Sequence, residues 1–191
     1  MRWADKIGII AHQYTEPRSN TLKPMTDDAP FADQETLLEL YAGTHPVNNQ
    51  PIFEKVLATP LQNSGDYRLL KSPLFVRGVA ALDSINVNPD SRGRFIVVER
   101  SGNLCIRVFF REPNEALEMQ LTAEIEKLAG CLDIKTDRAL VYSIHFGVGF
   151  SAIEQLMSKW INGDSASWIY GNVYDADSGE PLNWWQALLQ A

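Results

Sequence analysis

Residue types that could form a ligand site occur together in a glycine-rich run, residues 147–152 (GVGFSA). The run fits the pattern G-x-G-x-x-[GA], in which small residues let a backbone approach a pyrophosphate at the start of a helix. It lies between an expected strand and an expected helix, and Asp175 ends the next strand, where an acid could hold a ribose. The pattern therefore allows a nucleotide-binding or small enzyme domain that uses Gly147, Gly149 and Ser151.

The same run also has a purely structural interpretation, which we favour. Its two glycines make the turn, and Ser151 with Glu154 fits the S-x-x-E capping box of a helix N-terminus. A dinucleotide fold needs further strand–helix units, and too little chain follows Asp175 to build them. Nucleotide binding is kept as the alternative hypothesis for residues 147–152.

A second group of polar residues lies in the run DADSGEP, residues 175–181. Asp175, Asp177 and Glu180 resemble a fragment of a calcium loop, but Gly179 comes one residue earlier than the EF-hand pattern requires. Asp, Ser and Gly are also the ordinary residues of tight turns. We therefore expect neither a bound metal nor a cofactor.

Nucleophilic side chains and metal ligands are scattered along the chain. The histidines form no H-x-x-H or H-E-x-x-H spacing, and no G-x-S-x-G elbow occurs. Cys105 and Cys131 lie among apolar neighbours, so we expect two buried, reduced thiols. Because no catalytic constellation is complete, we expect that the chain is not an enzyme.

The charge balance limits the class of partner. The 191 residues include 24 acids against 17 lysines and arginines, a formal net charge of -7. Phosphate backbones and anionic membranes attract the opposite sign, so we expect neither nucleic acid nor membrane as a partner. One arginine-rich ribbon is the exception, and we expect it to pair with the acidic helix over residues 115–126. Its members are Arg92, Arg94, Arg100, Arg107 and Arg111.

The elements that must position these groups predict an α+β fold with a strand-rich centre and two to three covering helices. A hairpin is predicted over about residues 94–110, because two strand-like runs flank the turn residues 101–103. A helix is expected from Asn114 onward. A β-α-β unit is predicted over about residues 139–175, and its two strands would be parallel neighbours.

We expect two segments that form one compact unit. Residues 65–191 are predicted to form the α+β domain. Residues 1–64 are predicted to form an N-terminal segment with one or two short helices packed on that domain, because apolar residues recur at helical spacing over residues 33–43 and 52–58. No run approaches the roughly 20 apolar residues of a membrane span, and the first residues lack a secretory signal, so a cytoplasmic location is expected.

Three motifs follow one another in an order that is typical of a known family. The first is an extended segment into a proline and a small-residue turn closed by an acid, YRLLKSPLFVRGVAALDSI. The second is ERSGNLCIRVFF, and the third combines LVYSIHF, FSAIEQLMSKW and ASWIYGNVYD. Over about residues 66–175 the chain resembles an uncharacterised bacterial domain-of-unknown-function family. The resemblance implies a fold and no mechanism, and its members resemble toxin-immunity proteins encoded beside secreted bacterial toxins.

We therefore expect a cytoplasmic protein-binding protein, most concretely an immunity protein that neutralises a cognate bacterial toxin. A basic toxin would be drawn to an acidic face at an enhanced rate. Tryptophan is enriched among the residues that dominate binding energy at interfaces. The expected contact residues are Asp175, Asp177, Glu180 and Trp184. A structural or regulatory subunit that binds through the arginine-rich ribbon is a further alternative.

Overall fold

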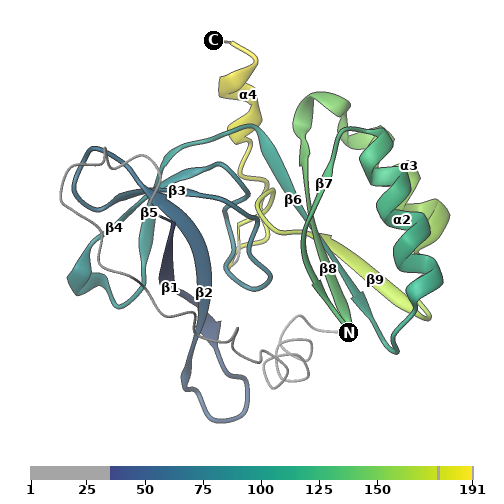
Figure 1. Cartoon of the computed structure of the whole chain (residues 1–191), viewed down its shortest axis with the longest axis horizontal. Helices are drawn as coiled ribbons and strands as arrows, with labels where there is room; N and C mark the ends of the chain where they lie inside the picture. The colour runs from purple at the N-terminus through teal and green to yellow at the C-terminus, as the bar shows by residue number, and fades with distance from the viewer. Residues whose placement is uncertain (1–34, 176, 191) are drawn as a thin grey trace, which may run out of the picture.

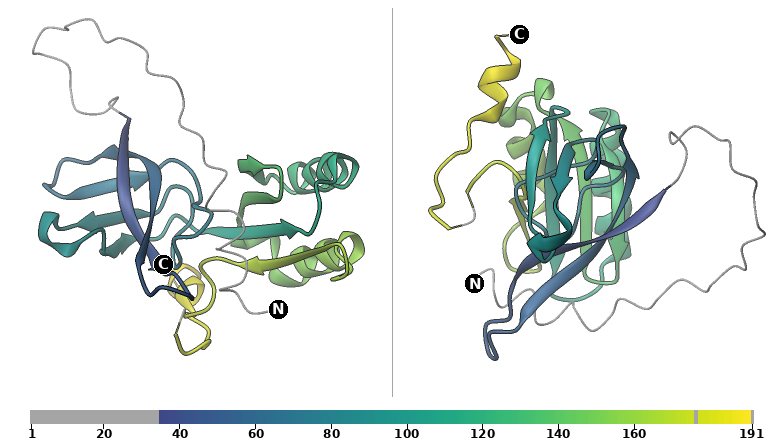
Figure 2. Two further views of the ribbon diagram at one scale, coloured as in Figure 1. Left: turned by 90° about the horizontal axis from the view of Figure 1, so that it is seen from below. Right: turned by 90° about the vertical axis from the view of Figure 1, so that its left-hand side faces the viewer.

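The computed structural model describes residues 35–175 and 177–190, whose strands form two antiparallel sheets. Figure 1 shows the five-stranded sheet, here sheet A, beside the four-stranded sheet, here sheet B. Two helices cover the face of sheet B that is turned away from sheet A. Figure 2 shows this arrangement of sheet A, sheet B and helices from two further directions. The expected α+β class, with a strand-rich centre and covering helices, is confirmed.

Sheet A is built from consecutive strands, each antiparallel to the next. Burial alternates along its first two strands, as expected for strands with one face on a core. The sheet curls enough for the N–H of Tyr41 on the first strand to donate to the carbonyl of Gly93, which precedes the last strand, at 2.8 Å. The elements are β1 (Thr36–Thr44), β2 (Pro51–Pro60), β3 (Asp66–Leu69), β4 (Ser84–Val87), the 3-10 turn η2 (Pro89–Ser91) and β5 (Phe95–Glu99).

Sheet B has the strand order β7-β8-β6-β9, and every neighbouring pair is antiparallel. Its chain order is strand, helix, strand, strand, helix, strand, the ferredoxin-like arrangement. The elements are β6 (Asn103–Phe110), α2 (Glu115–Lys127), β7 (Cys131–Thr136), β8 (Ala139–His145), the 3-10 turn η3 (Phe146–Val148), α3 (Phe150–Trp160), β9 (Ala166–Tyr170) and a short C-terminal helix α4 (Trp184–Leu188). None of the helices in the described part of the chain has the length and hydropathy of a membrane-spanning segment.

The two faces of sheet B line two separate cores, because successive side chains of a strand point to opposite faces. Cys105 and Phe109 of β6 belong to the core that sheet B shares with sheet A. Ile106 and Val108 of the same strand belong to the core beneath the helices, together with Leu121 of α2. Since β6 contributes to both cores and pairs on both edges, it is the central strand of the fold.

The predicted hairpin over residues 94–110 is wrong, although both of its strands exist. β5 pairs with β4 in sheet A, whereas β6 pairs with β8 and β9 in sheet B. Between them the N–H of Ser101 donates to the carboxylate of Asp83 at 2.8 Å. The turn residues therefore carry the chain from one sheet to the other and do not close a ladder.

The predicted β-α-β unit over residues 139–175 is correct in its elements and wrong in its pairing. Strand β8, helix α3 and strand β9 follow one another as expected. However, β6 lies between the two strands and is antiparallel to both. The two strands therefore run in the same direction without being neighbours.

The short helices predicted before residue 64 are also wrong where the structure describes the chain. Residues 36–44 and 51–60 are the strands β1 and β2, which pair along almost their whole length. β2 then pairs with β3, so the chain on both sides of the boundary expected at residues 64 and 65 forms one sheet. The rest of the N-terminal segment, residues 1–34, lies outside the described residues.

Candidate functional site

An irregular segment, residues 72–81, passes between the two sheets and is buried or half-buried along its whole length. Loops normally run over the surface, because a buried backbone needs partners for its polar groups. Glu54 of β2, which is only 6% exposed, supplies some of the hydrogen-bond acceptors that this segment needs. Its carboxylate accepts hydrogen bonds from the N–H groups of residues 74–76 at 2.7, 2.8 and 2.9 Å.

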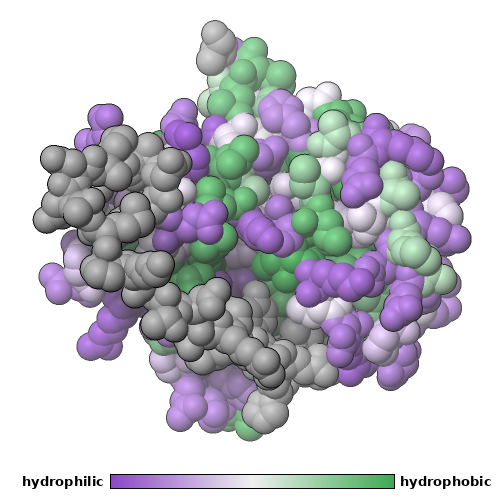
Figure 3. All heavy atoms as spheres, in the orientation of Figure 1, coloured by the Kyte–Doolittle hydropathy of each residue, from purple (hydrophilic) through white to green (hydrophobic). Residues whose placement is uncertain are grey.

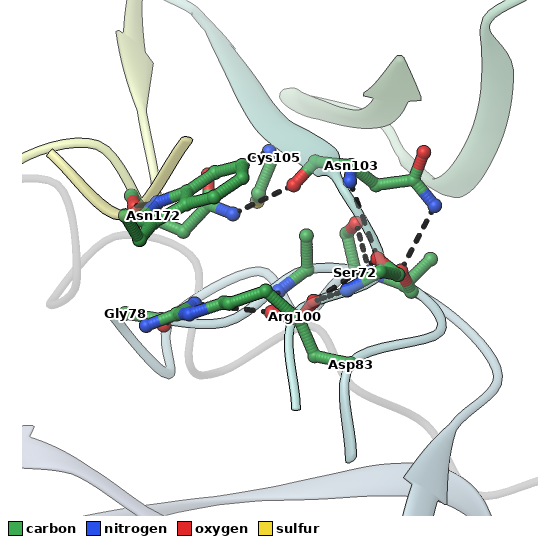
Figure 4. A network of polar contacts seen from close by, with 11 residues as sticks. Ser72, Gly78, Asp83, Arg100, Asn103, Cys105 and Asn172 are labelled. Carbon is green, nitrogen blue, oxygen red and sulfur yellow. Dashed lines mark hydrogen bonds and ion pairs between the residues drawn. The ribbon is translucent and has the colours of Figure 1, made fainter. Parts of the chain in front are cut away.

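A second buried carboxylate, that of Asp83, joins this segment to the start of β6. It accepts hydrogen bonds from the N–H of Ser101 at 2.8 Å and from the guanidinium of Arg100 at 3.1 Å. Burial raises the pKa of Asp83, and the hydrogen bonds from Ser101 and the charge of Arg100 oppose that rise. Figure 4 shows this polar network, in which Asn103 donates to a carbonyl of the buried segment as well.

Arg107 is the third buried charge, and it lies in the middle of β6 with 0% of its surface exposed. Its Nε donates to the carbonyl of Pro73 at 3.1 Å, and its Nη2 donates to the carbonyl of Val76. Its Nη1 is buried and has no hydrogen-bond partner among the described residues. Gly171 packs against this side chain so closely that a Cβ there would lie 2.9 Å from Arg107 Cζ.

An open pocket of about 400 Å³ lies beside Arg107, along β9, which is the edge strand of sheet B. Its floor and walls combine aromatic rings with charges of both signs. Burial and the nearby charge of Arg107 lower the pKa of Arg77. Burial, followed by the charge of Glu154, raises the pKa of Tyr170. The lining residues are Arg77, Arg107, Glu154, Trp168, Ile169, Tyr170, Gly171, Tyr174 and Asp175.

The structure brings the predicted acidic residues together on one exposed turn. The carboxylate of Asp175 accepts the N–H groups of Asp177 and Ser178 at 3.1 and 2.8 Å, and its own N–H donates to the carbonyl of Glu180 at 2.8 Å. All three acids are exposed, and Asp175 also borders the pocket. No group of His, Cys, Asp or Glu within the described ranges could hold a metal ion.

Trp184, the fourth predicted contact residue, is half-buried and fastens the C-terminal segment to the domain. Its Nε1 donates to the carbonyl of Asn172 at 2.7 Å, and the guanidinium of Arg100 lies over its ring at 5.5 Å from the centroid. Asn172 in turn accepts the N–H of Cys105 at 2.9 Å and donates to the carbonyl of Asn103 at 2.8 Å. Figure 4 shows Asn172 between the C-terminal segment and β6.

Beyond this anchor, the C-terminal segment exposes apolar side chains. Leu189 is 71% exposed and Tyr174 is 47% exposed, while Leu182 and Leu188 are each 37% exposed. In Figure 3 hydrophobic atoms gather over α4 at the top of the molecule and continue below it. The acidic turn and these apolar residues belong to the same segment, residues 174–189.

In the glycine-rich run 147–152 the two glycines make the predicted turn, but the predicted helix cap does not form. Gly149 is the N-cap of α3, without a side-chain cap, so the predicted capping box of Ser151 and Glu154 is absent. Gly147 lies in the turn η3, and its N–H donates to the imidazole Nδ1 of His145 at 3.1 Å. Neither glycine nor Ser151 lines the pocket. Every neighbouring pair of strands in sheet B is antiparallel, unlike the pairs of a dinucleotide fold.

The arginines expected to form one ribbon lie in different surroundings. Arg94 lies over the ring of Tyr41, Arg100 pairs with Asp83, and Arg107 is buried. Arg92, which precedes β5, and Arg111, which follows β6, are both exposed. The ribbon is divided because β5 and β6 belong to different sheets. The prediction of two buried thiols is half right, since Cys105 is buried and Cys131 is exposed.

Sequence reasoning missed the pocket and its residue Arg77. The signal that could have found it is local: an arginine inside the otherwise apolar run PLFVRGVAAL, whose burial forces a charge into or beside the core. Arg77 lies close to Arg107, however, only because of the way the segment folds over β6. No local pattern predicts that approach.

Comparison with known proteins bears on the fold. The model of a family described as a domain of unknown function (DUF4265) matches residues 54–168. A crystal structure described as that of a hypothetical protein from Neisseria gonorrhoeae is similar, with a TM-score of 0.55 and 14% sequence identity. The likeness covers 72% of this chain and 92% of that one. No curated protein matches the sequence significantly.

Proposed function

Because the chain belongs to the family of the domain of unknown function DUF4265, whose description names no activity, we propose a function from the exposed surface: the chain binds another protein through residues 174–189. The observation that carries this proposal is the exposure of Tyr174, Leu182, Leu188 and Leu189 beside the acidic turn. Exposed apolar side chains that are rimmed by polar ones mark protein interaction sites.

The charge of this surface indicates the chemistry of the partner. Asp175, Asp177 and Glu180 lie on one exposed turn, and the whole chain carries a formal net charge of -7. A basic partner would be attracted to such a face and would associate faster than a neutral one. In its most concrete form, the chain is a cytoplasmic immunity protein that neutralises a basic bacterial toxin by covering part of its surface.

The experiment starts from the product of the gene that neighbours this one. The two proteins are co-expressed, one of them tagged, and both complex formation and growth protection are measured. We expect a complex that weakens as salt rises, together with protection of the cells. Absence of a complex and of protection would overturn the proposal, whereas a complex without protection would favour a structural or regulatory subunit.

Variants locate the contact. The double variant Asp177→Lys with Glu180→Lys reverses two exposed charges, and it should slow association and reduce the salt dependence. Leu189→Asp should speed dissociation, because it places a charge in the apolar part of the contact. The matched control is Glu99→Lys on β5, an equally exposed acid of sheet A, which should leave both rates unchanged.

A further inference from the structure

Among the described strands, sheet B has two edges, β7 and β9, and they differ in how well they resist pairing with a further strand. The register of β7 shifts between Leu132 and Ile134, and its sequence CLDIKT includes two charges. Register shifts and charges on an edge strand hinder pairing with another chain. β9, with the sequence ASWIY, has no charge and no proline, and it pairs with β6 without a register shift. The left view of Figure 2 shows this unprotected strand at the border of sheet B.

The backbone of β9 offers hydrogen bonds on its open side. The N–H of Gly171 donates to the carbonyl of Cys105 at 2.7 Å, which places the odd-numbered residues of β9 in the hydrogen-bonded pairs with β6. The N–H and carbonyl groups of Trp168 and Tyr170 therefore point away from β6, where no described strand pairs with them. These four groups are the hydrogen-bonding positions that an added strand would use.

The pocket of about 400 Å³ lies along this edge and is lined by four consecutive residues, 168–171. Successive side chains of a strand point to opposite faces of the sheet, so a space that touches all four lies beside the strand and reaches both faces. A compact ligand would occupy one face only. An extended chain beside β9 would place its own side chains alternately on both faces, as the pocket requires.

Each face of this edge has one buried polar atom without a hydrogen-bond partner in the described part of the chain. On the helix side it is the hydroxyl of Tyr170, whose ring meets that of Trp168 at 5.0 Å between centroids. On the side of sheet A it is Nη1 of Arg107, whose guanidinium lies against Gly171, where no side chain covers it. Buried polar groups are normally hydrogen-bonded. Neighbouring residues of one added strand would reach both atoms, one on each face.

The charges around the pocket limit the chemistry of this strand. Arg77 and Arg107 line the pocket together with Glu154 and Asp175, so neither sign of charge is favoured. A largely neutral segment fits best. On the helix side, β-branched or aromatic side chains would pack against the two rings of β9. On the other face, the oxygen of a Ser, Thr, Asn or Gln side chain would accept from Nη1 of Arg107.

We propose that the edge of β9 binds an extended segment of another protein, which joins sheet B as a fifth strand. Main-chain hydrogen bonds to Trp168 and Tyr170 supply the affinity, and the alternate side chains supply the selectivity. Arg77 and Tyr174 flank the strand in the pocket, so a single chain reaches the edge more easily than a second sheet with flanking residues of its own. The inference does not rest on the protein-binding surface proposed above, although Tyr174 and Asp175 belong to both.

The first experiment selects peptides on the full chain from a phage-displayed library of random sequences of about ten residues, the upper length of a typical strand. The strongest binders are synthesised with an N-methyl group at each amide in turn. We expect methylation at alternate amides, those that face β9, to weaken binding about tenfold or more, and methylation at the amides between them to have little effect. Absence of any enriched peptide, or effects of methylation without this alternation, would overturn the proposal.

Amide hydrogen exchange of the full chain, followed by NMR, locates the added strand. In the free protein the N–H groups of Trp168 and Tyr170 should exchange quickly, while those of Ser167 and Ile169, which face β6, are protected. Bound peptide should slow the first two and leave β7 unchanged. Unchanged exchange of both with peptide bound, or protection of both in the free monomer, would contradict the proposal. Protection that rises with protein concentration alone would replace it with a second copy of this chain at the edge.

Variants separate this site from the other surface. Trp168→Thr removes a ring and keeps a β-branched residue, so the strand should persist while peptide affinity falls about tenfold. The matched control is Phe53→Thr on β2, where the aromatic side chain is 39% exposed, and it should leave affinity unchanged. Leu189→Asp, which tests residues 174–189, should also leave peptide affinity unchanged, so the two proposals can fail separately. Native affinity in Trp168→Thr would place the peptide elsewhere and refute the site.

Discussion

At the scale of single residues, three buried charges replace the hydrogen bonds that a strand partner would give to the segment 72–81. Glu54 accepts from its N–H groups, Arg107 donates to its carbonyls, and Asp83 binds its end to Ser101. Each charge therefore satisfies backbone groups that burial has removed from water. The stability of the segment depends on these side chains more than on local propensity.

Substitution of Glu54 tests this dependence. Glu54→Gln keeps one acceptor oxygen and should lower the free energy of unfolding by about 1–3 kcal/mol. Glu54→Ala leaves the N–H groups of residues 74–76 without an acceptor and should lower it by about 3–5 kcal/mol. Urea denaturation measures both, with the exposed Glu99→Gln as the control. Equal stability of Glu54→Ala and the native chain would show that another group or water satisfies the segment.

Tyr142 gives a pH dependence at the same scale. Burial raises its pKa from 10.0 to about 12, and the hydrogen bond with Thr122 opposes part of that rise. Between these values the unfolded chain has released a proton that the folded chain keeps, so the free energy of unfolding falls as pH rises. The slope from this group is up to about 1.4 kcal/mol per pH unit, and it vanishes below the pKa of the unfolded chain.

Urea denaturation over the alkaline range measures that slope. Tyr142→Phe should show a flatter decline, although it starts from a lower stability because it loses the bond to Thr122. Tyr174→Phe, at a side chain that is 47% exposed, is the matched control and should decline as the native chain does. The same decline in all three proteins would mean that Tyr142 is not kept protonated by the fold.

At the scale of elements, sequence patterns predicted three of the four strands of sheet B and its two covering helices, but not β7 and not the pairing of the strands. The i, i+4 apolar stripe of α2 and the alternation in β6 and β8 correspond to real elements. The error at residues 94–110 arose because a Ser-Gly-Asn turn between two strand-like runs is locally compatible with a hairpin. The hydrogen bond from the N–H of Ser101 to Asp83 joins residues that are far apart in the sequence, so a local pattern does not predict it.

The N-terminal strands show a different limit of local patterns. Apolar residues at positions 37, 40 and 41 fit one face of a helix, but in β1 the burial pattern follows the pairing with β2. Tertiary pairing thus overrides a short helical periodicity. At the candidate sites the same contrast holds. The acidic turn 175–180 is contiguous in sequence and was found, whereas Arg77 and Arg107 are 30 residues apart and meet only in the fold.

The packing of β6 against the strand-to-turn residue Gly171 gives a prediction at this scale. A Cβ at Gly171 would lie 2.6 Å from Cys105 Sγ and 2.9 Å from Arg107 Cζ, and both side chains are fully buried. Gly171→Ala should therefore lower the free energy of unfolding by about 1–3 kcal/mol through overpacking. Thermal and urea denaturation measure the change.

Gly147→Ala is the matched control for this substitution. The nearest atom to its added Cβ is Nδ1 of His145 at 2.9 Å, in an exposed side chain that can move aside with the loss of one exposed hydrogen bond from the Gly147 N–H. Neither glycine has a left-handed backbone, so backbone strain does not contribute to the comparison. If both variants lost the same stability, the contact with Arg107 would not be the cause for Gly171→Ala.

At the scale of the whole molecule, the two sheets share one core and are also joined by the buried polar segment between them. Residues from both sheets, including Leu40 of β1 and Val141 of β8, belong to the same core. The segment 72–81 is held from sheet A by Glu54 and from sheet B by Arg107. Opening either sheet alone would therefore expose the shared core and leave buried charges without their partners.

Native-state amide hydrogen exchange measures whether the sheets open together. We expect the most protected amides of β2 and of β8 to exchange with the same opening free energy, equal to that of global unfolding, because they belong to one cooperative unit. Glu54→Ala should lower both values by the same amount, although Glu54 lies in sheet A. A lower opening free energy in β2 than in β8 would show that sheet A unfolds separately.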